Sequence, residues 1–289
     1  MSKDLPQPAK LPPFLFGFVS FCASALTSLR MLLSKKETKW FEVNLEKIWF
    51  LRPKSTFANM FIRQVYHNQL IVAFETLLEV FFPGCITFEG VEEFEAAMLP
   101  LEREQQGQIM VSAHLGSWEL IGYAASRISA CKFYALAKPS KYKAVTALLD
   151  RMRRRMKILV LWTSGASAQK NMIRALKEGS WLGFIMDQKP MGRRGPKVDF
   201  WGHQTEFVGG PAQMAIKFKK PVLAAFCVRV GVLRYRLFTK KILDVGHNHE
   251  DIHSLTQAMA SEIESAVKAY PEQWCWNYKR WRFDDKMTV

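Results

Sequence analysis

The chain has 289 residues, of which 49% are hydrophobic and 23% are charged. This composition is typical of a folded globular protein, and it excludes an intrinsically disordered chain and a multi-pass membrane protein. The 41 Lys and Arg residues outnumber the 26 Asp and Glu residues, which gives a formal net charge of +15. We therefore expect an anionic partner, and nucleic acid, an anionic membrane surface and an acidic carrier protein would each fit.

The longest uncharged stretch lies near the N-terminus, from Leu11 to Leu29. As a helix it would be about 28 Å long, close to the ~30 Å of a bilayer's hydrocarbon core. It is either a spanning helix or an anchor lying in the membrane interface, and Ala23-Ser24-Ala25 also leaves a cleaved signal peptide open. Because Arg30 and three lysines follow at once, the rest of the chain is expected in the cytoplasm.

After this anchor, the apolar spacing from Phe57 to Phe82 predicts a long helix that stops at Pro83-Gly84. From Ile86 onward, short apolar runs alternate with amphipathic stretches of helical length. This alternation predicts an α/β domain with a largely parallel sheet flanked by helices. We thus expect an N-terminal membrane anchor in residues 1–45 and one domain in residues 46–289. The seven expected strands are Ile86–Phe88, Ile109–Ala113, Phe133–Ala137, Ile158–Trp162, Trp181–Met186, Val222–Val228 and Tyr235–Phe238, and the helices between them are Trp118–Ser129, Lys141–Met156, Ala166–Lys177, Pro211–Lys219 and Ile252–Tyr270.

The strongest chemical signal follows the second of these strands, where His114 ends the strand, Gly116 and Ser117 form a turn, and Glu119 lies in the first turn of a helix. This turn lets the chain double back so that Glu119 reaches the imidazole. A carboxylate on one ring nitrogen makes the other more basic, so His114 would take a proton from a hydroxyl. The alternative is structural, with a strand-end histidine and a first-turn acid favoured by the helix dipole.

A second signal is Asp187-Gln188, which ends another apolar strand. Ligands of α/β sheets bind at this edge, so Asp187 and Gln188 would share a crevice with His114 if the two strands are neighbours. The alternative is an Asp that caps a turn.

The third signal is positive charge. Nine Lys and Arg residues but one acid lie between Lys132 and Lys157, including Arg153 and Arg154. Lys189, Arg193 and Arg194 add charge beside Asp187. These side chains would bind a phosphate-bearing substrate through charge-assisted hydrogen bonds, although a solvated helix face is the usual meaning of such a run.

Several common sites are missing from the sequence. The five cysteines are far apart, with no C-x-x-C pair and no Cys/His cluster. This spacing disfavours a structural zinc site and a disulfide framework, and it suits a reducing compartment. No Walker A loop, G-x-G-x-x-G or G-x-S-x-G motif is present. We expect no metal and no cofactor.

Together, four blocks of the sequence resemble the bacterial lipid A late acyltransferases (lauroyl and myristoyl transferases), within the lysophospholipid acyltransferase superfamily. The blocks run from the N-terminal anchor to the last ten residues, and the one ending the chain is close to the family's own ending. They are Ser112–Glu119, Asp187-Gln188, Val198–Gly202 with Gly210–Ala212, and Pro271–Trp276 with Lys279–Arg282.

The resemblance implies transfer of a fatty acyl group from acyl carrier protein, or from acyl-CoA, to a hydroxyl of a phosphorylated glycolipid at the cytoplasmic face of the bacterial inner membrane. His114 would be the general base and Glu119 its orienting partner. Arg153 matches the family's arginine, with Arg154 as the alternative register. The partners would be the acyl donor, a lipid A precursor or related glycolipid, and the anionic membrane surface, but not nucleic acid.

Two other functions stay open. One is a glycerolipid acyltransferase that uses acyl-CoA, although that branch usually carries Asp in place of Glu119 and an E-G-T-R-like block that this chain lacks. The other is a non-enzymatic basic protein of the membrane surface, which explains the net charge but not the paired strand-end residues.

Overall fold

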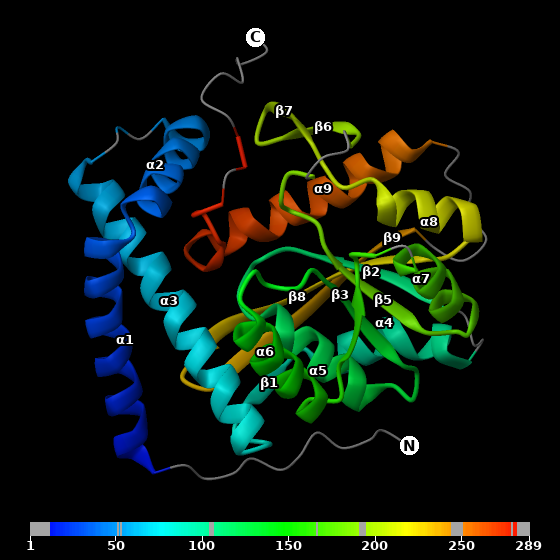
Figure 1. The fold of residues 1–289 in the computed structure, drawn as a ribbon, viewed down its shortest axis with the longest axis horizontal. Coiled ribbons are helices and arrows are strands. Elements are labelled where there is room, and N and C mark those ends of the chain that lie inside the picture. Colours follow the sequence, from blue (N-terminus) through cyan, green and yellow to red (C-terminus); the bar gives the residue numbers. More distant parts are fainter. Residues whose placement is uncertain are drawn as a thin grey trace.

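A computed structural model describes residues 12–50, 52, 54–103, 107–165, 167–190, 195–243, 251–278, 280 and 281. Its core is a seven-stranded sheet in the order β1-β9-β8-β2-β5-β3-β4, and β6 and β7 form a separate hairpin (Figure 1). The strands are β1 (Thr87–Glu89), β2 (Gln108–Ser112), β3 (Phe133–Ala137), β4 (Leu159–Trp162), β5 (Trp181–Ile185), β6 (Lys197–Phe200), β7 (His203–Glu206), β8 (Val222–Gly231) and β9 (Arg234–Leu243).

The sheet is mainly parallel, as the sequence predicts. Strands β8, β2, β5, β3 and β4 run in one direction, and β9 returns antiparallel to β8. All five residues of β2 are buried, because both of its faces are covered by helices. The sequence analysis did not predict the hairpin β6-β7, whose four-residue strands are joined by a tight turn at Trp201-Gly202.

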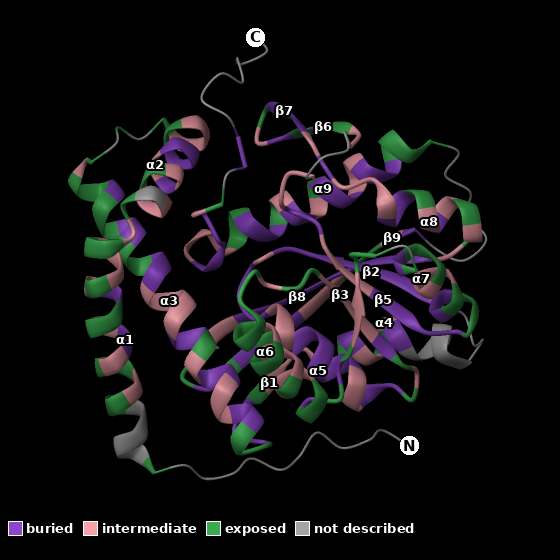
Figure 2. Ribbon diagram, viewed as in Figure 1, coloured by how far each residue is buried: buried purple, intermediate pink, exposed green. Residues whose placement is uncertain are grey.

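Helices cover both faces of the sheet, and the buried residues form two clusters, one on each side (Figure 2). Helices α4 and α5 lie on one face, whereas α7, α8 and α9 contribute to the cluster on the other. The helices are α1 (Pro13–Leu33), α2 (Lys35–Trp49), α3 (Thr56–Phe81), α4 (Val91–Arg103), α5 (Trp118–Ile128), α6 (Lys143–Arg155), α7 (Ala168–Lys177), α8 (Gly210–Phe218), α9 (Ile252–Ala269) and the short 3₁₀ helix η1 (Pro271–Gln273).

The N-terminal helices form a layer at one side of the domain, where α1 lies against α3 (Figure 1). The residue before α3 is Ser55, whose hydroxyl accepts a hydrogen bond from the Ala58 N–H, as expected of an N-cap. Phe41 and Leu45 of α2 belong to the main hydrophobic cluster. The expected division between residues 45 and 46 therefore falls inside a helix that packs on the domain.

The segment that was expected to anchor the chain in a membrane is helical. Within the described ranges, no single helix has both the length and the apolar composition needed to cross a bilayer. Gly17–Leu33 and Glu37–Trp49 meet those criteria only together, and the two are bent by 89°. The inner face of α1 carries small buried residues such as Ala23, whereas Phe21 and Leu32 on its outer face are each 72% exposed.

Candidate active site

The register of two neighbouring strands brings His114 and Asp187 together. Strands β2 and β5 pair in parallel, with Ser112 opposite Ile185 at their ends. His114 and Asp187 each lie two residues beyond that pair, so both arrive at the same point on the carboxyl edge of the sheet. The expectation that their strands are neighbours is thus correct, and this edge is where α/β folds bind ligands.

The Asp187 carboxylate is 2% exposed and lies behind the imidazole. Its Oδ1 atom is 2.7 Å from His114 Nδ1, and its Oδ2 atom accepts hydrogen bonds from the His114 backbone N–H at 3.0 Å and from Trp274 Nε1 at 2.7 Å. Burial by itself would raise the pKa of Asp187, but the His114 side chain and these three hydrogen bonds outweigh it and lower that pKa. Asp187 is therefore held as the carboxylate.

Glu119 is not the residue that pairs with the imidazole, and this expectation from the sequence is wrong. Its carboxylate forms a two-pronged ion pair with Arg153 of α6, in which Nη2 donates to Oε1 at 2.5 Å and Nε to Oε2 at 3.0 Å. The side chain of Arg153 is only 12% exposed and that of Glu119 only 17%. Because Glu119 begins a helix that leaves the sheet edge, whereas Asp187 follows the strand next to His114, only Asp187 reaches the ring nitrogen.

The turn after His114 is fixed by two distant segments. Gly116 has φ of +57°, and a Cβ atom there would lie 2.2 Å from the Cys227 carbonyl oxygen of β8, so a side chain is excluded. On the other side, the Gly116 N–H donates to the Gln273 carbonyl at 3.0 Å, and the Cys275 N–H donates to the His114 carbonyl at 3.0 Å. The C-terminal block Pro271–Trp276 thus holds the turn and supplies Trp274 to Asp187.

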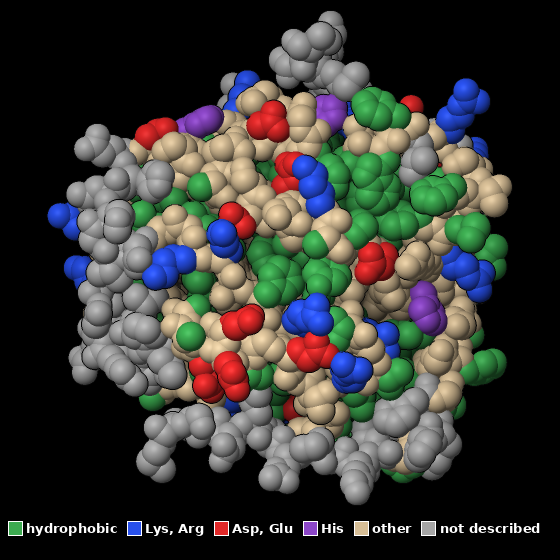
Figure 3. Space-filling view, turned by 180° about the vertical axis from the view of Figure 1, so that it is seen from behind, with side chains coloured by type: hydrophobic (Ala, Val, Ile, Leu, Met, Phe, Trp, Pro, Cys, Tyr) green, Lys and Arg blue, Asp and Glu red, His purple; other side chains and the backbone are tan. Residues whose placement is uncertain are grey.

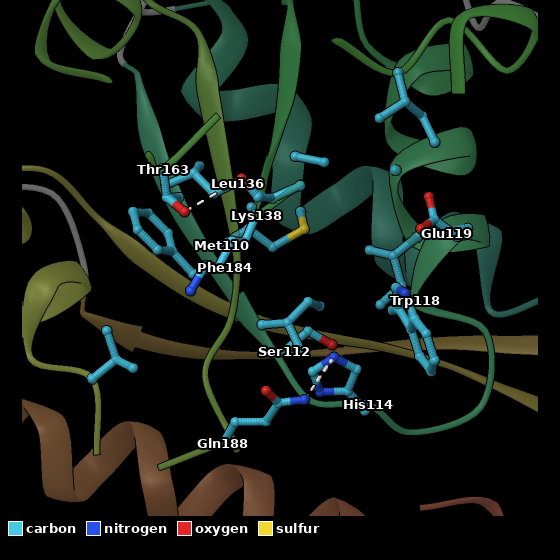
Figure 4. A pocket seen from close by; sticks show the side chains of 18 of the residues that line it. Met110, Ser112, His114, Trp118, Glu119, Leu136, Lys138, Thr163, Phe184 and Gln188 are labelled. Atoms are coloured by element: carbon cyan, nitrogen blue, oxygen red, sulfur yellow. Dashed lines mark hydrogen bonds between the residues drawn. The ribbon is translucent and has the colours of Figure 1, made fainter. Parts of the chain in front are cut away.

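His114 opens onto a cavity of about 760 Å³, within the usual size range of ligand sites (Figure 4). Trp118 and Tyr278 stand beside the imidazole, with ring centroids 4.9 and 5.0 Å away. Burial raises the pKa of the Tyr278 phenol to about 12, so this ring is neutral at physiological pH. Gln188 Nε2 lies 3.4 Å from His114 Nε2, which is the nitrogen that faces the cavity.

One arm of the cavity is an apolar slot along the face of the sheet that α5 covers. Met110 and Ser112 precede His114 in the alternation of β2, so these three side chains follow one another along this face. Phe133 lines the far part of the slot, and its ring tip fills the space above Gly183, where an added Cβ would approach it to 2.5 Å. The slot is lined by Met110, Ile121, Gly122, Phe133, Ala135, Ile158 and Gly183.

The predicted cationic residues take different positions. Arg153 and Lys189 line the cavity, as does Lys138 at the end of β3, which the sequence analysis did not single out. Arg154, the residue of the alternative register, is 73% exposed and forms an ion pair with Asp150, so of these two arginines only Arg153 lines the cavity. Arg193 and Arg194 lie outside the described residues.

Asp187 was predicted to bind substrate, but it does not line the cavity and instead contacts His114. Four side chains near the imidazole were not predicted as site residues: Ser112, Trp118, Trp274 and Tyr278. Trp274 and Tyr278 lie more than 150 positions from His114 along the chain, so local spacing gives no signal for them; the C-terminal block Pro271–Trp276 was the only pointer to Trp274. Within the part of the chain that the structure describes, no group of three His, Cys, Asp or Glu side chains has the arrangement of a metal site.

Comparisons with known proteins place the chain in a family. The family model of the bacterial lipid A biosynthesis acyltransferases matches residues 32–283. A phosphatidylinositol mannoside acyltransferase of Mycobacterium tuberculosis (strain ATCC 25618 / H37Rv) is 24% identical over 199 residues, or 68% of this chain. The match covers 60% of that relative's length. The region matched by the family model covers most of the chain and contains His114, Asp187, the slot and the C-terminal block. The chain therefore belongs to the bacterial lipid A biosynthesis acyltransferase family.

Proposed function

We propose that this acyltransferase moves a fatty acyl group from a carrier thioester to a hydroxyl of a lipid A precursor or a related glycolipid, with His114 as the general base. The acceptor oxygen attacks the thioester carbonyl, so a carbon–oxygen bond forms and the carbon–sulfur bond breaks. The hydroxyl proton passes to His114 Nε2 and then to the departing thiolate.

The observation that carries this proposal is the position of the imidazole between a buried carboxylate and an open cavity. Because a carboxylate only accepts hydrogen bonds, Nδ1 carries the proton that it shares with Asp187 at 2.7 Å. Nε2 then presents its lone pair to the cavity, where a hydroxyl would displace the weakly held Gln188 amide. Asp187 takes the orienting role that the sequence assigned to Glu119.

The apolar slot is suited to the fatty chain of the donor. Its walls offer alkyl and aromatic groups from β2, β3, β5 and α5, and burial of each methylene there is worth about 0.8 kcal/mol. Ser112 lies between His114 and Met110 on this wall, and its hydroxyl is buried with no hydrogen-bond partner among the described residues. It is therefore available to donate to the oxyanion that forms when the thioester is attacked.

The charged groups at the cavity favour phosphate-bearing substrates. Lys138 and Lys189 line it, as does Arg153, which is paired with Glu119, and four further Lys and Arg residues of the basic run lie on α6. On the opposite side of the molecule, basic and acidic side chains are interspersed among apolar ones (Figure 3). This distribution supports an acidic acyl carrier protein as donor, with acyl-CoA as the alternative, because both carry the acyl group on an arm whose far end bears a phosphate.

We also propose that the protein works at the cytoplasmic face of the bacterial inner membrane, with α1 as an interfacial anchor. The outer face of α1 exposes Phe18, Phe21, Leu32 and Leu33 by more than 60% each. Lys35 and Lys39 of α2 follow directly and are exposed, so they would meet anionic headgroups. Loss of vesicle binding on Phe21→Glu and Leu32→Glu substitution would support this location, and unchanged binding would contradict it.

A matrix of donors and acceptors tests the reaction. The full-length protein is incubated with acyl carrier protein or CoA thioesters and with a lipid A precursor, a phosphatidylinositol mannoside or a lysophospholipid, and mass spectrometry identifies the acylated product. We expect acylation of a glycolipid by the wild-type protein and a loss of about 10³-fold or more in His114→Ala. Retention of activity by His114→Ala, in a folded protein, would exclude the mechanism, whereas acylation of the lysophospholipid alone would favour the glycerolipid alternative.

A further inference from the structure

A second cavity of about 320 Å³ lies between α3 and α6, on the other side of Trp118 from the slot. Two helices and two turns form its walls, and most of the side chains that line it are apolar. The apolar ones include Val72, Ala73 and Leu77 of α3 and Leu148, Leu149 and Met152 of α6.

The polar groups of this lining are already paired within the protein. The Thr76 hydroxyl bonds to that of Ser117 at 3.0 Å, and the Gln273 amide bonds to the backbone of Arg229 through both its oxygen and its nitrogen. Glu119 is held by Arg153. Burial raises the pKa of the Cys275 thiol, which keeps it neutral. The cavity therefore offers an uncharged ligand mainly apolar contact.

The two cavities share a wall at the reaction centre. Trp118, Glu119 and Leu149 line both of them, and the edge of the Trp118 ring is in contact with the His114 ring. The ion pair between Glu119 and Arg153 joins α5 to α6 across this wall. A molecule that reaches His114 from one cavity is thus next to a second, separate apolar space.

The mouth of the second cavity lies on the side of the N-terminal helices. Ala73 and Leu148 are exposed at its rim, Leu148 by 57%. Gln69, which lines the cavity, accepts a hydrogen bond from Arg30 of α1 at 3.1 Å. The helix with the exposed apolar face and this cavity are therefore joined by a direct contact, so an alkyl chain leaving a bilayer beside α1 has a short path into the protein.

We propose that the second cavity binds an alkyl chain of the acceptor lipid, a chain that is not transferred. This inference rests on the proposed function, because transfer between lipids brings two apolar chains to one histidine. The slot takes the chain of the donor, and the cavity between α3 and α6 takes a chain of the acceptor. Trp118 separates the two chains and keeps the acceptor hydroxyl on the side of His114 Nε2.

The first experiment does not depend on catalysis. The full-length protein, in vesicles of phosphatidylethanolamine and phosphatidylglycerol, is irradiated with a dodecyl glucoside that carries a diazirine at the end of its chain, and the labelled peptides are mapped. We expect labels on residues 68–77 and 148–152 in the wild-type protein, and their loss in Ala73→Trp, whose indole fills the mouth. Met60→Trp is the matched control, since Met60 is 67% exposed on α3 and does not line the cavity.

The second experiment measures kinetics with both variants. Ala73→Trp should raise the KM for a lipid acceptor by about tenfold and leave kcat within about twofold, because it removes binding without touching the reacting groups. Hydrolysis of the donor thioester in the absence of acceptor should stay unchanged. Met60→Trp should match the wild-type protein in all three measurements.

The outcomes separate this inference from the proposed function. If the wild-type protein transfers no acyl group, the proposed function is wrong. The labelling still reports whether the cavity binds an alkyl chain. Labels confined to other parts of the chain, or equal labelling of residues 68–77 and 148–152 in Ala73→Trp, would overturn the inference. Loss of the label when the phosphatidylglycerol fraction of the vesicles is raised, but not when a lipid A precursor is added, would also overturn it, because the cavity would then bind a bilayer lipid.

Discussion

Two buried carboxylates, Asp187 and Glu75, differ in what their partners face. Asp187 is 2% exposed and accepts hydrogen bonds from His114 and Trp274. Glu75 of α3 is 3% exposed and accepts from Arg229 at 2.8 and 2.9 Å, from the Tyr235 hydroxyl at 2.8 Å and from a backbone N–H at 3.2 Å. Both are fully supplied with donors, as buried charges require.

The difference is that His114, the partner of Asp187, lines an open cavity, whereas Arg229 and Tyr235 line neither that cavity nor the one between α3 and α6. Glu75 joins α3 to strands β8 and β9, so its network holds the N-terminal layer on the sheet. A buried, hydrogen-bonded carboxylate therefore indicates a role in a reaction only where its partner can still contact a substrate.

Replacement of Asp187 tests the catalytic side of this comparison and should have the largest effect. Asp187→Asn removes the negative charge that stabilises a protonated His114 and favours the wrong ring tautomer. We expect kcat for acyl transfer to fall between about 10²- and 10⁴-fold. Circular dichroism checks that the variant is folded, and a folded variant with wild-type kcat would remove Asp187 from the mechanism.

Replacement of Glu75 tests the structural side. Glu75→Gln leaves Arg229, whose side chain is only 20% exposed, without its counter-charge, so the free energy of unfolding should fall by about 3 kcal/mol, measured in urea. The kcat of the folded fraction should stay within about threefold of the wild-type value. A large fall in kcat without loss of stability would mean that the two carboxylates do not differ in the way proposed.

The same comparison extends to apolar residues. Phe133 is buried and lines the slot, whereas Phe94 of α4 is buried and lines none of the described cavities. Phe133→Ala lengthens the slot, so the ratio of kcat/KM between donors that differ by two carbons should shift toward the longer chain by about tenfold or more. Phe94→Ala should destabilise the protein through its own cavity but keep the wild-type chain preference. An equal preference in both variants would place the end of the acyl chain elsewhere.

The smallest effect expected is on the pH dependence of stability. Because the pKa of Asp187 is lowered in the folded protein, this residue contributes stability above its unfolded pKa of about 3.9, and the contribution is lost as the pH falls through the folded value. The difference in unfolding free energy between the wild-type protein and Asp187→Asn should therefore shrink below about pH 4. A difference that stays constant between neutral and acidic pH would show that the His114 contact does not stabilise the carboxylate.

Much of the site could be predicted from the sequence, since His114 and Asp187 each end an apolar strand before a turn. Local periodicity identifies such positions because it depends only on neighbouring residues. The partner of the imidazole could not be predicted in this way. Glu119 is five positions from His114 and Asp187 is 73 positions away, yet the pairing of β2 with β5 brings Asp187 to the ring.

The sequence alone determined the α/β class and the mainly parallel sheet. It also determined the resemblance to a family and the strand ends that carry His114 and Asp187. The tertiary structure alone decided that Arg153 and not Arg154 lines the cavity, that Trp274 donates to Asp187, and that Glu119 of α5 pairs with Arg153 of α6. The physical reason is that helix and strand periods fix which face a residue occupies along its own segment. Which segments become neighbours depends on how all of them bury their apolar faces together.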